Sequence, residues 1–334
     1  MSFKLCVIGC GNILERCHGP SYLKYKAENP DFELAACCDI DEDRASRYAK
    51  KFGFSRYYTN FHEMLHQIQP DAVCILVNEE YIAEVAIQVM NLGFPVFVEK
   101  PPGKNTDETL SLIASAKANG VFHQVGYNRR GIPLLQELKK LLKKQEDIQF
   151  IRYELCRIGR CDEDFSDTTI HGIDTVRYLT DADFKKIHFS YQPLSQYGQN
   201  VYNIYMDCVM TSGVHAQLCF FPDTGAVLER ATVHAANHTW MAHLPIWEFG
   251  YDRPGELIHI YNNETLTRLS GASLCNSDQV YMTNGFYYEN KVFFDNLRNH
   301  QKPLTGFEES LHNMIIKDCI SSRKAFFDAE KGHK

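Results

Sequence analysis

The first forty residues place the strongest constraint on the fold of this chain. They run from an apolar segment at residues 4–8, through a turn that contains Gly9 and Gly11, into a helical segment, and on to a second apolar segment at residues 34–38 that leads into Asp39. This order is typical of a βαβ unit that binds a dinucleotide, because glycines let a pyrophosphate approach the backbone at the start of a helix. The acid after the second strand accepts hydrogen bonds from a ribose.

The glycine turn departs from the usual pattern at one position. Gly9 and Gly11 supply the tight turn and the close approach, but Leu14 stands where a third glycine normally lets helix and strand pack closely. An ordinary strand, turn and helix followed by an unrelated surface aspartate would give the same pattern. The position at the start of the chain and the spacing to Asp39 favour the dinucleotide interpretation.

Short apolar segments alternate with helical ones up to about residue 126. Strands are predicted at 4–8, 33–38, 72–77, 96–99 and 122–126, and helices at 13–26, 42–52, 61–68, 82–92 and 106–119. This alternation predicts an α/β fold with a parallel, doubly wound sheet of the Rossmann type.

Beyond residue 126 the pattern changes to the period-two alternation of half-buried strands. It occurs at 149–159, 201–211, 215–221, 226–235 and 256–261, with helices predicted at 134–144, 167–179, 286–299 and 308–327. Consecutive strands without helices between them predict an α/β domain with a large, mainly antiparallel open sheet. We therefore expect two domains, residues 1–126 and 127–334, which the length of 334 residues also favours.

Composition narrows the class of protein. A net charge of -7 gives no basic surface for a nucleic acid, and no apolar run reaches the roughly 18 residues of a membrane span. The twelve cysteines form no C-x-x-C pair, and Cys6, Cys37, Cys38 and Cys74 lie in apolar strands, as small buried side chains in a reducing compartment do. The chain enters a strand without a signal-peptide pattern, so we expect a cytoplasmic protein.

Lys100 is the first candidate for chemistry. An apolar strand runs into Glu99, Lys100 and Pro101, and ligands of open α/β sheets bind beyond the carboxyl ends of the strands. Lys100 would therefore point at the cofactor crevice, with Pro101 restricting the backbone around it. A solvated lysine at the end of a strand fits the same pattern equally well.

The second candidate is the helical segment from Asp167 to Asp174. On a helix, Asp167 and His171 are neighbours four residues apart, and Asp174 lies three residues after His171. A carboxylate beside an imidazole raises its basicity and fixes its tautomer, as a general base that takes a proton from an alcohol requires. An ordinary helix with charges on its polar face, and Ile170 and Ile173 on its buried face, also fits.

Two other groups of residues are weaker candidates. His234, His238 and His243 are of a type that binds zinc, but a strand and a loop would place them on different faces. We therefore predict no metal site and expect these histidines in a substrate pocket or on the surface. The lysines at 139–144 are predicted to form the solvated face of a helix.

Taken together, these motifs resemble the glucose–fructose oxidoreductase / inositol dehydrogenase (Gfo/Idh/MocA) family. The matching segments are 9–13, 34–41 with Arg44, 93–101, 125–130 and 167–174, and the most specific are the Glu-Lys-Pro element and the D-x3-H-x2-D helix. They cover the predicted N-terminal domain and the first part of the second. Similar proteins join a Rossmann domain to an α/β domain whose open sheet commonly makes subunit contacts. The family typically oxidises or reduces a secondary alcohol or carbonyl on a sugar, polyol or sugar derivative.

The resemblance implies a role for each predicted site residue. Lys100 would hydrogen-bond the reacting oxygen, His171 would be the base in oxidation and the acid in reduction, and Asp167 would orient His171; these three are the predicted catalytic residues. The predicted cofactor-binding residues are Gly9, Gly11, Asn12, Ile13, Asp39, Arg44, Val77, Asn78, Glu99, Lys100 and Asn128. The predicted substrate-binding residues are Lys100, Asn128, Arg129, Asp167 and His171. Residues 77–82 depart from the Thr-Pro and His that relatives usually carry, which leaves the contacts of that loop undefined.

We predict NAD rather than NADP as the cofactor. Asp39 would accept hydrogen bonds from the ribose hydroxyls and repel a 2′-phosphate, although Arg44 could turn toward such a phosphate. The predicted function is an NAD-dependent dehydrogenase acting on CH–OH groups of a sugar or polyol. By analogy with the family, it would be a dimer or tetramer formed through the C-terminal sheet.

Two alternative functions also fit the sequence. One is an NAD-dependent glycosidase or lyase that oxidises a sugar hydroxyl transiently and returns the hydride. The other is a non-catalytic sensor that binds a dinucleotide. Lys100, Asp167 and His171 disfavour the sensor, because a sensor needs no acid–base pair.

Overall fold

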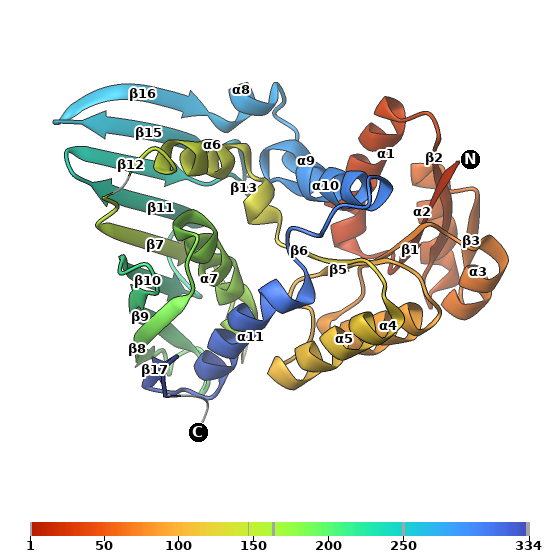
Figure 1. Ribbon diagram of the computed structural model, residues 1–334, viewed down its shortest axis with the longest axis horizontal. Coiled ribbons are helices and arrows are strands. Elements are labelled where there is room, and N and C mark those ends of the chain that lie inside the picture. The colour runs from red at the N-terminus through yellow and green to blue at the C-terminus, as the bar shows by residue number, and fades with distance from the viewer. Residues whose placement is uncertain (1, 146, 162–163, 249–250, 332–334) are drawn as a thin grey trace. The chain divides into compact units, whose positions relative to one another are not determined.

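The protein is described here from a computed structural model, drawn as a ribbon in Figure 1, which describes residues 2–145, 147–161, 164–248 and 251–331. The chain divides into two compact units. Unit 1 comprises Met1–Asn128 and Phe286–Met314, and unit 2 comprises Arg129–Gly285 and Ile315–Lys334.

Unit 1 is built around a six-stranded parallel sheet, which confirms the predicted Rossmann-type fold. The strands are β1 (Phe3–Ile8), β2 (Phe32–Cys38), β3 (Arg56–Tyr58), β4 (Ala72–Ile75), β5 (Val96–Glu99) and β6 (His123–Gly126). Their order in the sheet is β3-β2-β1-β4-β5-β6. The order reverses between β1 and β4, so the crevice for a ligand lies beyond the carboxyl ends of these two strands.

The helices of unit 1 begin and end where local chemistry favours it. The Asp41 side chain accepts a hydrogen bond from the Arg44 N–H at the start of α2, and Gly53 ends that helix in the left-handed conformation. The helix predicted at 13–26 instead begins with a π-helical turn, Leu14–His18, before α1. The helices are α1 (Gly19–Glu28), α2 (Glu42–Phe52), α3 (Phe61–Ile68), α4 (Glu79–Asn91), α5 (Thr106–Asn119) and α10 (Phe286–Arg298).

The division into units differs from the two contiguous domains expected from the sequence. Residues 286–314 belong to unit 1, whereas the sequence analysis placed all of 127–334 in the second domain. The reason is apolar packing: the Phe294 ring of α10 lies 4.8 Å from the ring of Phe32 and 4.9 Å from that of Tyr25. Thr305 and Val125 also pair through their backbones, with N···O distance 2.7 Å. A helix distant in sequence thus completes the first core.

Unit 2 contains a nine-stranded mixed sheet. Only β7 and β10 are parallel neighbours among the described pairs, and the other neighbours are antiparallel, as expected for the second domain. The order is β16-β15-β12-β11-β7-β10-β9-β8-β17. The strands are β7 (Phe150–Cys156), β8 (Phe184–Pro193), β9 (Tyr202–Met210), β10 (His215–Phe221), β11 (Leu228–Ala235), β12 (His238–His243), β15 (Glu256–Tyr261), β16 (Glu264–Ser270) and β17 (Phe326–Asp328).

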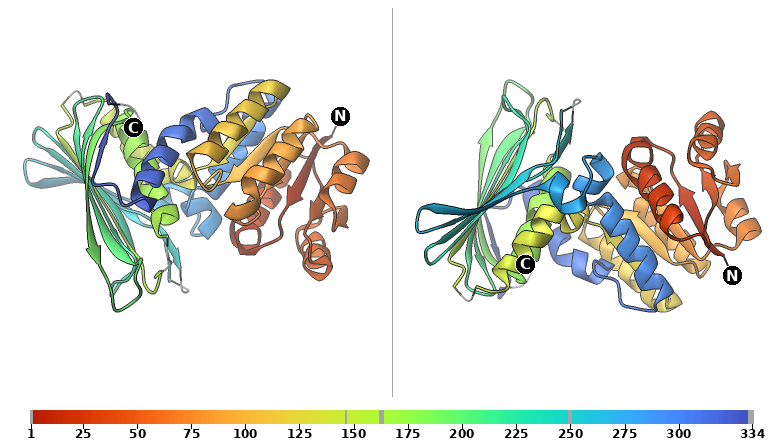
Figure 2. Two further views of the ribbon diagram at one scale, coloured as in Figure 1. Left: turned by 90° about the horizontal axis from the view of Figure 1, so that it is seen from below. Right: turned by 90° about the horizontal axis from the view of Figure 1, so that it is seen from above.

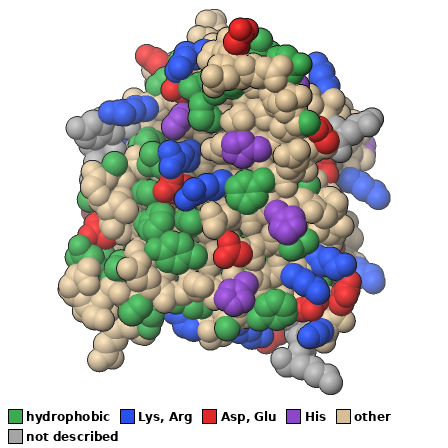
Figure 3. Space-filling model, turned by 90° about the vertical axis from the view of Figure 1, so that its left-hand side faces the viewer, with side chains coloured by type: hydrophobic (Ala, Val, Ile, Leu, Met, Phe, Trp, Pro, Cys, Tyr) green, Lys and Arg blue, Asp and Glu red, His purple; other side chains and the backbone are tan. Residues whose placement is uncertain are grey.

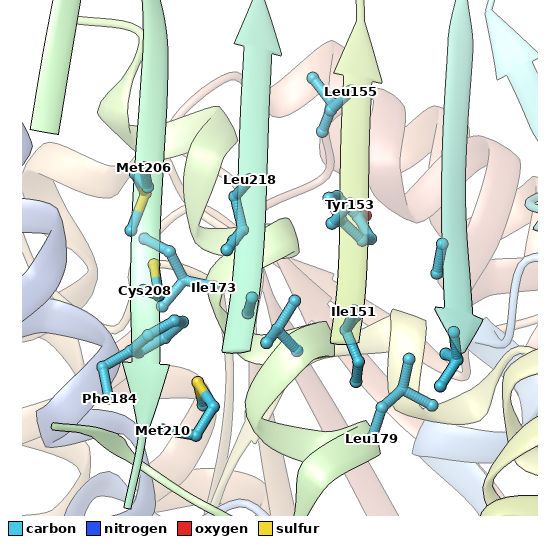
Figure 4. Packing of buried hydrophobic residues seen from close by; sticks show 14 of the residues in the cluster. Ile151, Tyr153, Leu155, Ile173, Leu179, Phe184, Met206, Cys208, Met210 and Leu218 are labelled. Atoms are coloured by element: carbon cyan, nitrogen blue, oxygen red, sulfur yellow. The ribbon is translucent and has the colours of Figure 1, made fainter. Parts of the chain in front are cut away.

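Two helices of unit 2, α6 (Pro133–Leu142) and α7 (Ser166–Thr180), lie on one face of this sheet (Figure 2). Figure 4 shows the core beneath them, where Ile173 and Leu179 of α7 meet Tyr153 of β7 and Leu218 of β10. Gly172 permits this approach, because a Cβ there would lie 2.7 Å from the Phe220 ring and 2.8 Å from the Tyr153 ring. The small elements of unit 2 are β13 (Ile246–Glu248), β14 (Tyr251–Arg253), α8 (Gly271–Cys275) and α9 (Val280–Thr283).

The opposite face of the nine-stranded sheet carries polar, aromatic and charged side chains side by side (Figure 3). Strand register explains the difference between the faces. One row across the sheet is the buried set Leu218, Tyr153, Ala231, Ala242 and Leu257, and the next row, on the other face, is Gln217, Arg152, Thr232, Met241 and Ile258.

Two expectations for unit 2 were wrong. The helix predicted at 308–327 is α11 (Phe307–Ser321), and the chain then turns to form β17. Lys139, predicted on a solvated helix face, is buried with its Nζ 2.5 Å from the Asp181 carboxylate, while Lys140 on the same helix is exposed. The Lys139 ammonium also lies 5.4 Å from the centre of the Tyr178 ring, and this cation–π contact and the Asp181 carboxylate offset its desolvation.

Candidate functional site

The glycine turn has the geometry that a dinucleotide requires. Gly9 has φ +98°, and a Cβ on it would lie 2.6 Å from the Leu76 carbonyl oxygen, so glycine is required there. A Cβ on Gly11 would meet no atom within 4 Å, which leaves the backbone of the turn open to a ligand. The turn follows β1 and the Leu76 loop follows β4, so the two segments meet at the reversal of strand order.

Asp39 is held against this turn by backbone donors. Its Oδ2 accepts from the Cys10 N–H at 2.8 Å and its Oδ1 from the Asp41 N–H at 3.0 Å, and the residue is 8% exposed. Arg44 lies 3.6 Å from Oδ1 of Asp39 and 3.3 Å from the Asp41 carboxylate. The carboxylate is therefore oriented before a ligand arrives, and Arg44 already has acidic neighbours.

The other predicted cofactor residues of the two loops lie at the same edge of the sheet. Asn12 and Asn78 are exposed, and Ile13 and Val77 are half-buried. Asn78 is also the residue before α4, in extended backbone conformation. Since β1 and β4 are neighbours, these four residues border one opening.

Glu99, Lys100 and Asn128 follow the next two strands. Lys100 comes directly after β5, forms a cis peptide with Pro101, and donates its backbone N–H to Glu99 Oε2 at 3.2 Å. Asn128 is buried two residues after β6, which pairs with β5 from Val96 and His123 to Glu99 and Gly126. The parallel register brings the residues after both strands to the same edge as the glycine turn.

A buried group that sequence reasoning missed adjoins Glu99. His18 Nε2 lies 2.6 Å from Glu99 Oε1, and the His18 ring is packed 5.6 Å from the rings of both Phe97 and Phe286. Glu289 of α10 completes a set in which the three potential ligand atoms lie within 4.8 Å of one another. An imidazole and two carboxylates at this spacing are the donor types of a zinc site, and they equally suit a hydrogen-bonded proton carrier.

In unit 2, α7 carries the predicted acid–base residues one turn apart. His171 is buried and its carbonyl accepts from the Thr175 hydroxyl at 2.7 Å. Asp167 forms an ion pair with Lys317 at 2.8 Å, a partner that the sequence did not indicate. Asp174 is fully buried and receives the Arg130 guanidinium at 2.6–3.1 Å. If α7 were an ordinary helix with charges on a polar face, that face would be solvated. Its acidic residues Asp167 and Asp174 instead form ion pairs, and Asp174 and His171 are buried.

Arg129, predicted to bind substrate, lies in a buried network of unit 2. Its Nε and Nη2 donate to the two oxygens of Glu229 at 3.0 and 2.9 Å, and Arg157 donates to the same carboxylate at 2.9 Å. The Tyr153 hydroxyl also donates to Glu229. Burial alone would raise the pKa of Glu229, but the two guanidiniums outweigh it and hold that pKa well below its usual range. The network borders a shallow recess that Trp247 helps to line.

Two of the three histidines considered as metal ligands, His234 and His238, have separate partners. His234 Nδ1 lies 3.0 Å from the Thr239 hydroxyl, and His238 Nδ1 lies 2.9 Å from Nε2 of His259. Trp240 is buried, with its ring stacked 5.3 Å from that of His238 and 4.7 Å from that of His259. These contacts place the aromatic groups within the packing of β12 and β15.

The family model for oxidoreductases with an NAD-binding Rossmann fold matches residues 3–127. This segment is similar to the oxidoreductases of the Gfo/Idh/MocA family. The Rossmann sheet, the glycine turn and Asp39 all lie within the matched segment, so a nicotinamide-type dinucleotide is the cofactor class of this family domain.

Two curated relatives of this chain come from Bacillus subtilis (strain 168). The scyllo-inositol 2-dehydrogenase (NADP(+)) IolU is 30% identical over 50% of this chain and 49% of its own length. The scyllo-inositol 2-dehydrogenase (NAD(+)) is 27% identical over 49% of this chain and 52% of its own length. The chain thus spans about half the length of the curated relatives it matches. Because one relative is named for NADP and the other for NAD, they do not decide between the two cofactors.

The likeness to solved structures extends over both units. A levoglucosan dehydrogenase in complex with NADH and levoglucosan has a TM-score of 0.82, 16% sequence identity, and coverage of 98% of this chain and 99% of that chain. At this identity the likeness concerns the fold. None of the helices in the described ranges combines the length and the hydropathy of a membrane span.

Proposed function

We propose that this protein is an oxidoreductase that transfers a hydride between a nicotinamide cofactor and a secondary alcohol or carbonyl of a sugar, polyol or sugar derivative. The observation that carries the proposal is the placement of Lys100 at the carboxyl edge of the sheet that also presents the glycine turn and Asp39. The names of the inositol dehydrogenase relatives and of the levoglucosan dehydrogenase support the substrate class.

The residues of unit 1 fit a dinucleotide. The backbone of Gly9 and Gly11 would face the pyrophosphate, and Asp39 would accept hydrogen bonds from the adenosine ribose, with Asn12, Ile13, Val77 and Asn78 bordering the same opening. When bound, the nicotinamide accepts the hydride in oxidation and supplies it in reduction. Glu99, Lys100 and Asn128 would line the nicotinamide end.

Lys100, His171 and Asp167 would perform the acid–base work. A lysine ammonium stabilises the negative charge that develops on the reacting oxygen, an effect typically worth about 3 kcal/mol or more. His171 would take the hydroxyl proton in oxidation and return it in reduction, which contributes about 10²–10⁴-fold. Asp167, with its Lys317 partner, would orient His171, and Asn128 and Arg129 would contact the substrate.

We propose NAD over NADP as the preferred cofactor. The Asp39 carboxylate is fixed by two backbone N–H groups, so it would repel a 2′-phosphate, and the Arg44 guanidinium lies near both Asp39 and Asp41. Recruiting Arg44 to a phosphate would require it to leave those carboxylates. Comparison of the two dissociation constants tests this preference, and tighter NADP binding overturns it.

We also propose that the protein self-associates as a dimer or tetramer through the sheet face shown in Figure 3, and that it works in the cytoplasm. The partly exposed apolar side chain of Met241 on that face supports self-association. The twelve cysteines, all of them buried or half-buried, fit a reducing compartment. Analytical ultracentrifugation tests the first point, and a monomer at micromolar concentration contradicts it.

A substrate screen tests the function directly. Purified protein is mixed with NAD⁺ or NADP⁺ and a panel of inositols, sugars and anhydrosugars, and absorbance at the reduced nicotinamide band is followed. We expect turnover with at least one cyclic polyol or sugar, and turnover slower by at least about 10²–10³-fold with the Lys100→Met variant. Nucleotide binding without turnover in either direction overturns the proposal and favours a sensor, and substrate conversion without net NADH favours a redox-neutral lyase.

A further inference from the structure

We propose that His18 is a positioning residue for Lys100, acting through Glu99. The inference rests on the catalytic function proposed above for Lys100. It concerns three residues of unit 1 whose contacts form a chain: an imidazole, a carboxylate and the backbone N–H that carries the lysine.

The helical segment after the glycine turn places His18 beside Glu99. Leu14–His18 form a π-helical turn. Such turns are rare in proteins as a whole, and many of those that occur lie at functional sites. His18, 0% exposed, ends that turn beside the rings of Phe97 and Phe286. A buried imidazole is unfavourable in such an apolar setting unless both nitrogens are hydrogen-bonded, because an unsatisfied nitrogen keeps its full desolvation cost.

Both nitrogens of His18 have partners. Nε2 meets Glu99 Oε1 at 2.6 Å, and Nδ1 faces the side-chain amide of Asn290, with Nδ2 at 2.9 Å and Oδ1 at 3.3 Å. Asn290 is itself held by donating to the Phe286 carbonyl at 2.7 Å. Asn290 presents both a donor and an acceptor to Nδ1, so the imidazole is held at both of its nitrogens. The Nε2 contact to Glu99 is short enough to fix the carboxylate firmly.

The Glu99 carboxylate contacts both His18 and the backbone of Lys100. While Oε1 is held by His18, Oε2 accepts the backbone N–H of Lys100 at 3.2 Å. The Glu99 side chain is 14% exposed, so without His18 it could turn toward water and release that N–H. Catalytic groups lose about 10²-fold in rate when misplaced by about 1 Å, so the loss would appear in turnover.

Glu289 provides the competing explanation that the test must exclude. Its carboxylate belongs to the same group of ligand atoms within 4.8 Å, and three such donors are the set a structural zinc ion would use. In that case His18 would hold a metal and would reach Lys100 only incidentally. Metal content therefore forms one arm of the experiment.

The test compares His18→Leu, which removes both hydrogen bonds, with His18→Gln, which keeps an amide donor for Glu99. With the substrate found in the screen, we expect His18→Leu to lower kcat by about 10–100-fold and His18→Gln to recover most of it. The dissociation constant for NAD⁺, measured by fluorescence, should change by less than about 2-fold, because Asp39 and the glycine turn are untouched. In a Lys100→Met background, His18→Leu should lower the residual kcat no further.

His123→Gln is the matched control. His123 is also buried in unit 1, lies 3.6 Å from Glu308 and stacks on Phe307, but no described contact links it to Glu99 or Lys100. Its loss should lower thermal stability without the specific fall in kcat. A His18→Leu enzyme with wild-type kcat, an additive loss with Lys100→Met, or one bound metal per chain that His18→Leu removes each overturns the proposal. If the wild type turns over no substrate, the proposed function fails first, and the role of His18 fails with it.

Discussion

Replacing Glu229 by glutamine should destabilise unit 2 severely while preserving its shape. Glu229 on β11 is 4% exposed, and its two oxygens receive three guanidinium hydrogen bonds at 2.9–3.0 Å and one from the Tyr153 hydroxyl. Glutamine removes the negative charge and turns one accepting oxygen into a donating amide. Arg129 and Arg157 would then lie in the core without the carboxylate that joins them.

The expected magnitude follows from the burial of the network. Removing one partner from a buried ion pair typically costs about 3–5 kcal/mol, because the opposite charge stays desolvated. We therefore expect the free energy of unfolding of unit 2 to fall by about 3–5 kcal/mol at pH 7. Glu256→Gln is the matched control, since the Glu256 and Arg268 side chains form an ion pair on the surface and such pairs contribute less than about 1 kcal/mol.

The pH dependence of this effect has a definite sign. The pKa of Glu229 is lowered in the folded protein from an ordinary value of 4.5, so folding favours its ionised form. Its contribution to stability is complete above about pH 4.5 and is lost progressively as the pH falls below that value toward the folded pKa. The difference between the wild type and Glu229→Gln should therefore be constant from pH 7 to about 5 and shrink below about 4.

Urea unfolding followed by tryptophan fluorescence measures the change. The chain has two tryptophans, and Trp240 and Trp247 both lie in unit 2, so the signal reports on the unit that contains Glu229. A loss below about 1 kcal/mol at pH 7, or a difference that grows as the pH is lowered from 7 to 4, would refute the assignment of a charge-compensated buried network. An equal loss in Glu256→Gln would show that burial does not decide the energy.

Three further substitutions test the dinucleotide and catalytic assignments. Lys100→Met should lower kcat by at least about 10²–10³-fold with an unchanged dissociation constant for NAD⁺, and retained turnover contradicts its role. Asp39→Ser should shift the ratio of NADP⁺ to NAD⁺ affinity toward NADP⁺ by about 10-fold or more, measured by titration of both nucleotides; an unchanged ratio contradicts the ribose assignment. Gly9→Ala should destabilise unit 1 by about 2–5 kcal/mol and abolish nucleotide binding, because a Cβ would lie 2.6 Å from the Leu76 oxygen at φ +98°; normal binding contradicts the close approach.

The elements that positioned the proposed site were predictable because their signals are local. β5 was predicted at 96–99 and is Val96–Glu99, and α7 was predicted at 167–179 and is Ser166–Thr180. A fully apolar run bounded by turn residues identifies a buried parallel strand, and residues four apart identify a helix face. The alternation of strands and helices in unit 1 likewise predicted a parallel sheet.

Among the described residues the sequence analysis did not predict β3, β8, β12, β13, β14, β16 and β17. Two of these, β16 and β17, are the edge strands of the large sheet and lack those signals. β16, Glu264–Ser270, reads ETLTRLS and is largely exposed at the edge of the sheet, so neither of its faces is apolar. β17 is three residues long and pairs with β8 at the opposite edge, with only Phe327 buried. Edge strands are fixed by the hydrogen bonds of a neighbour rather than by their own hydrophobic pattern, and a neighbour is not visible from local sequence.

The hydrogen bonds and ion pairs of the site residues also join residues that are distant in sequence. His18 and Glu99 are 81 positions apart, and Arg129 and Glu229 are 100 apart. From sequence, Arg129 was assigned to substrate by its position beside Asn128, which stays a prediction; the structure adds that its guanidinium neutralises a buried acid. The two descriptions imply different costs of substitution, one in substrate affinity and one in folding. The sequence specifies which polar side chains the protein has. The packing of strands and helices decides which of them pair with one another in the interior and which border the proposed ligand site.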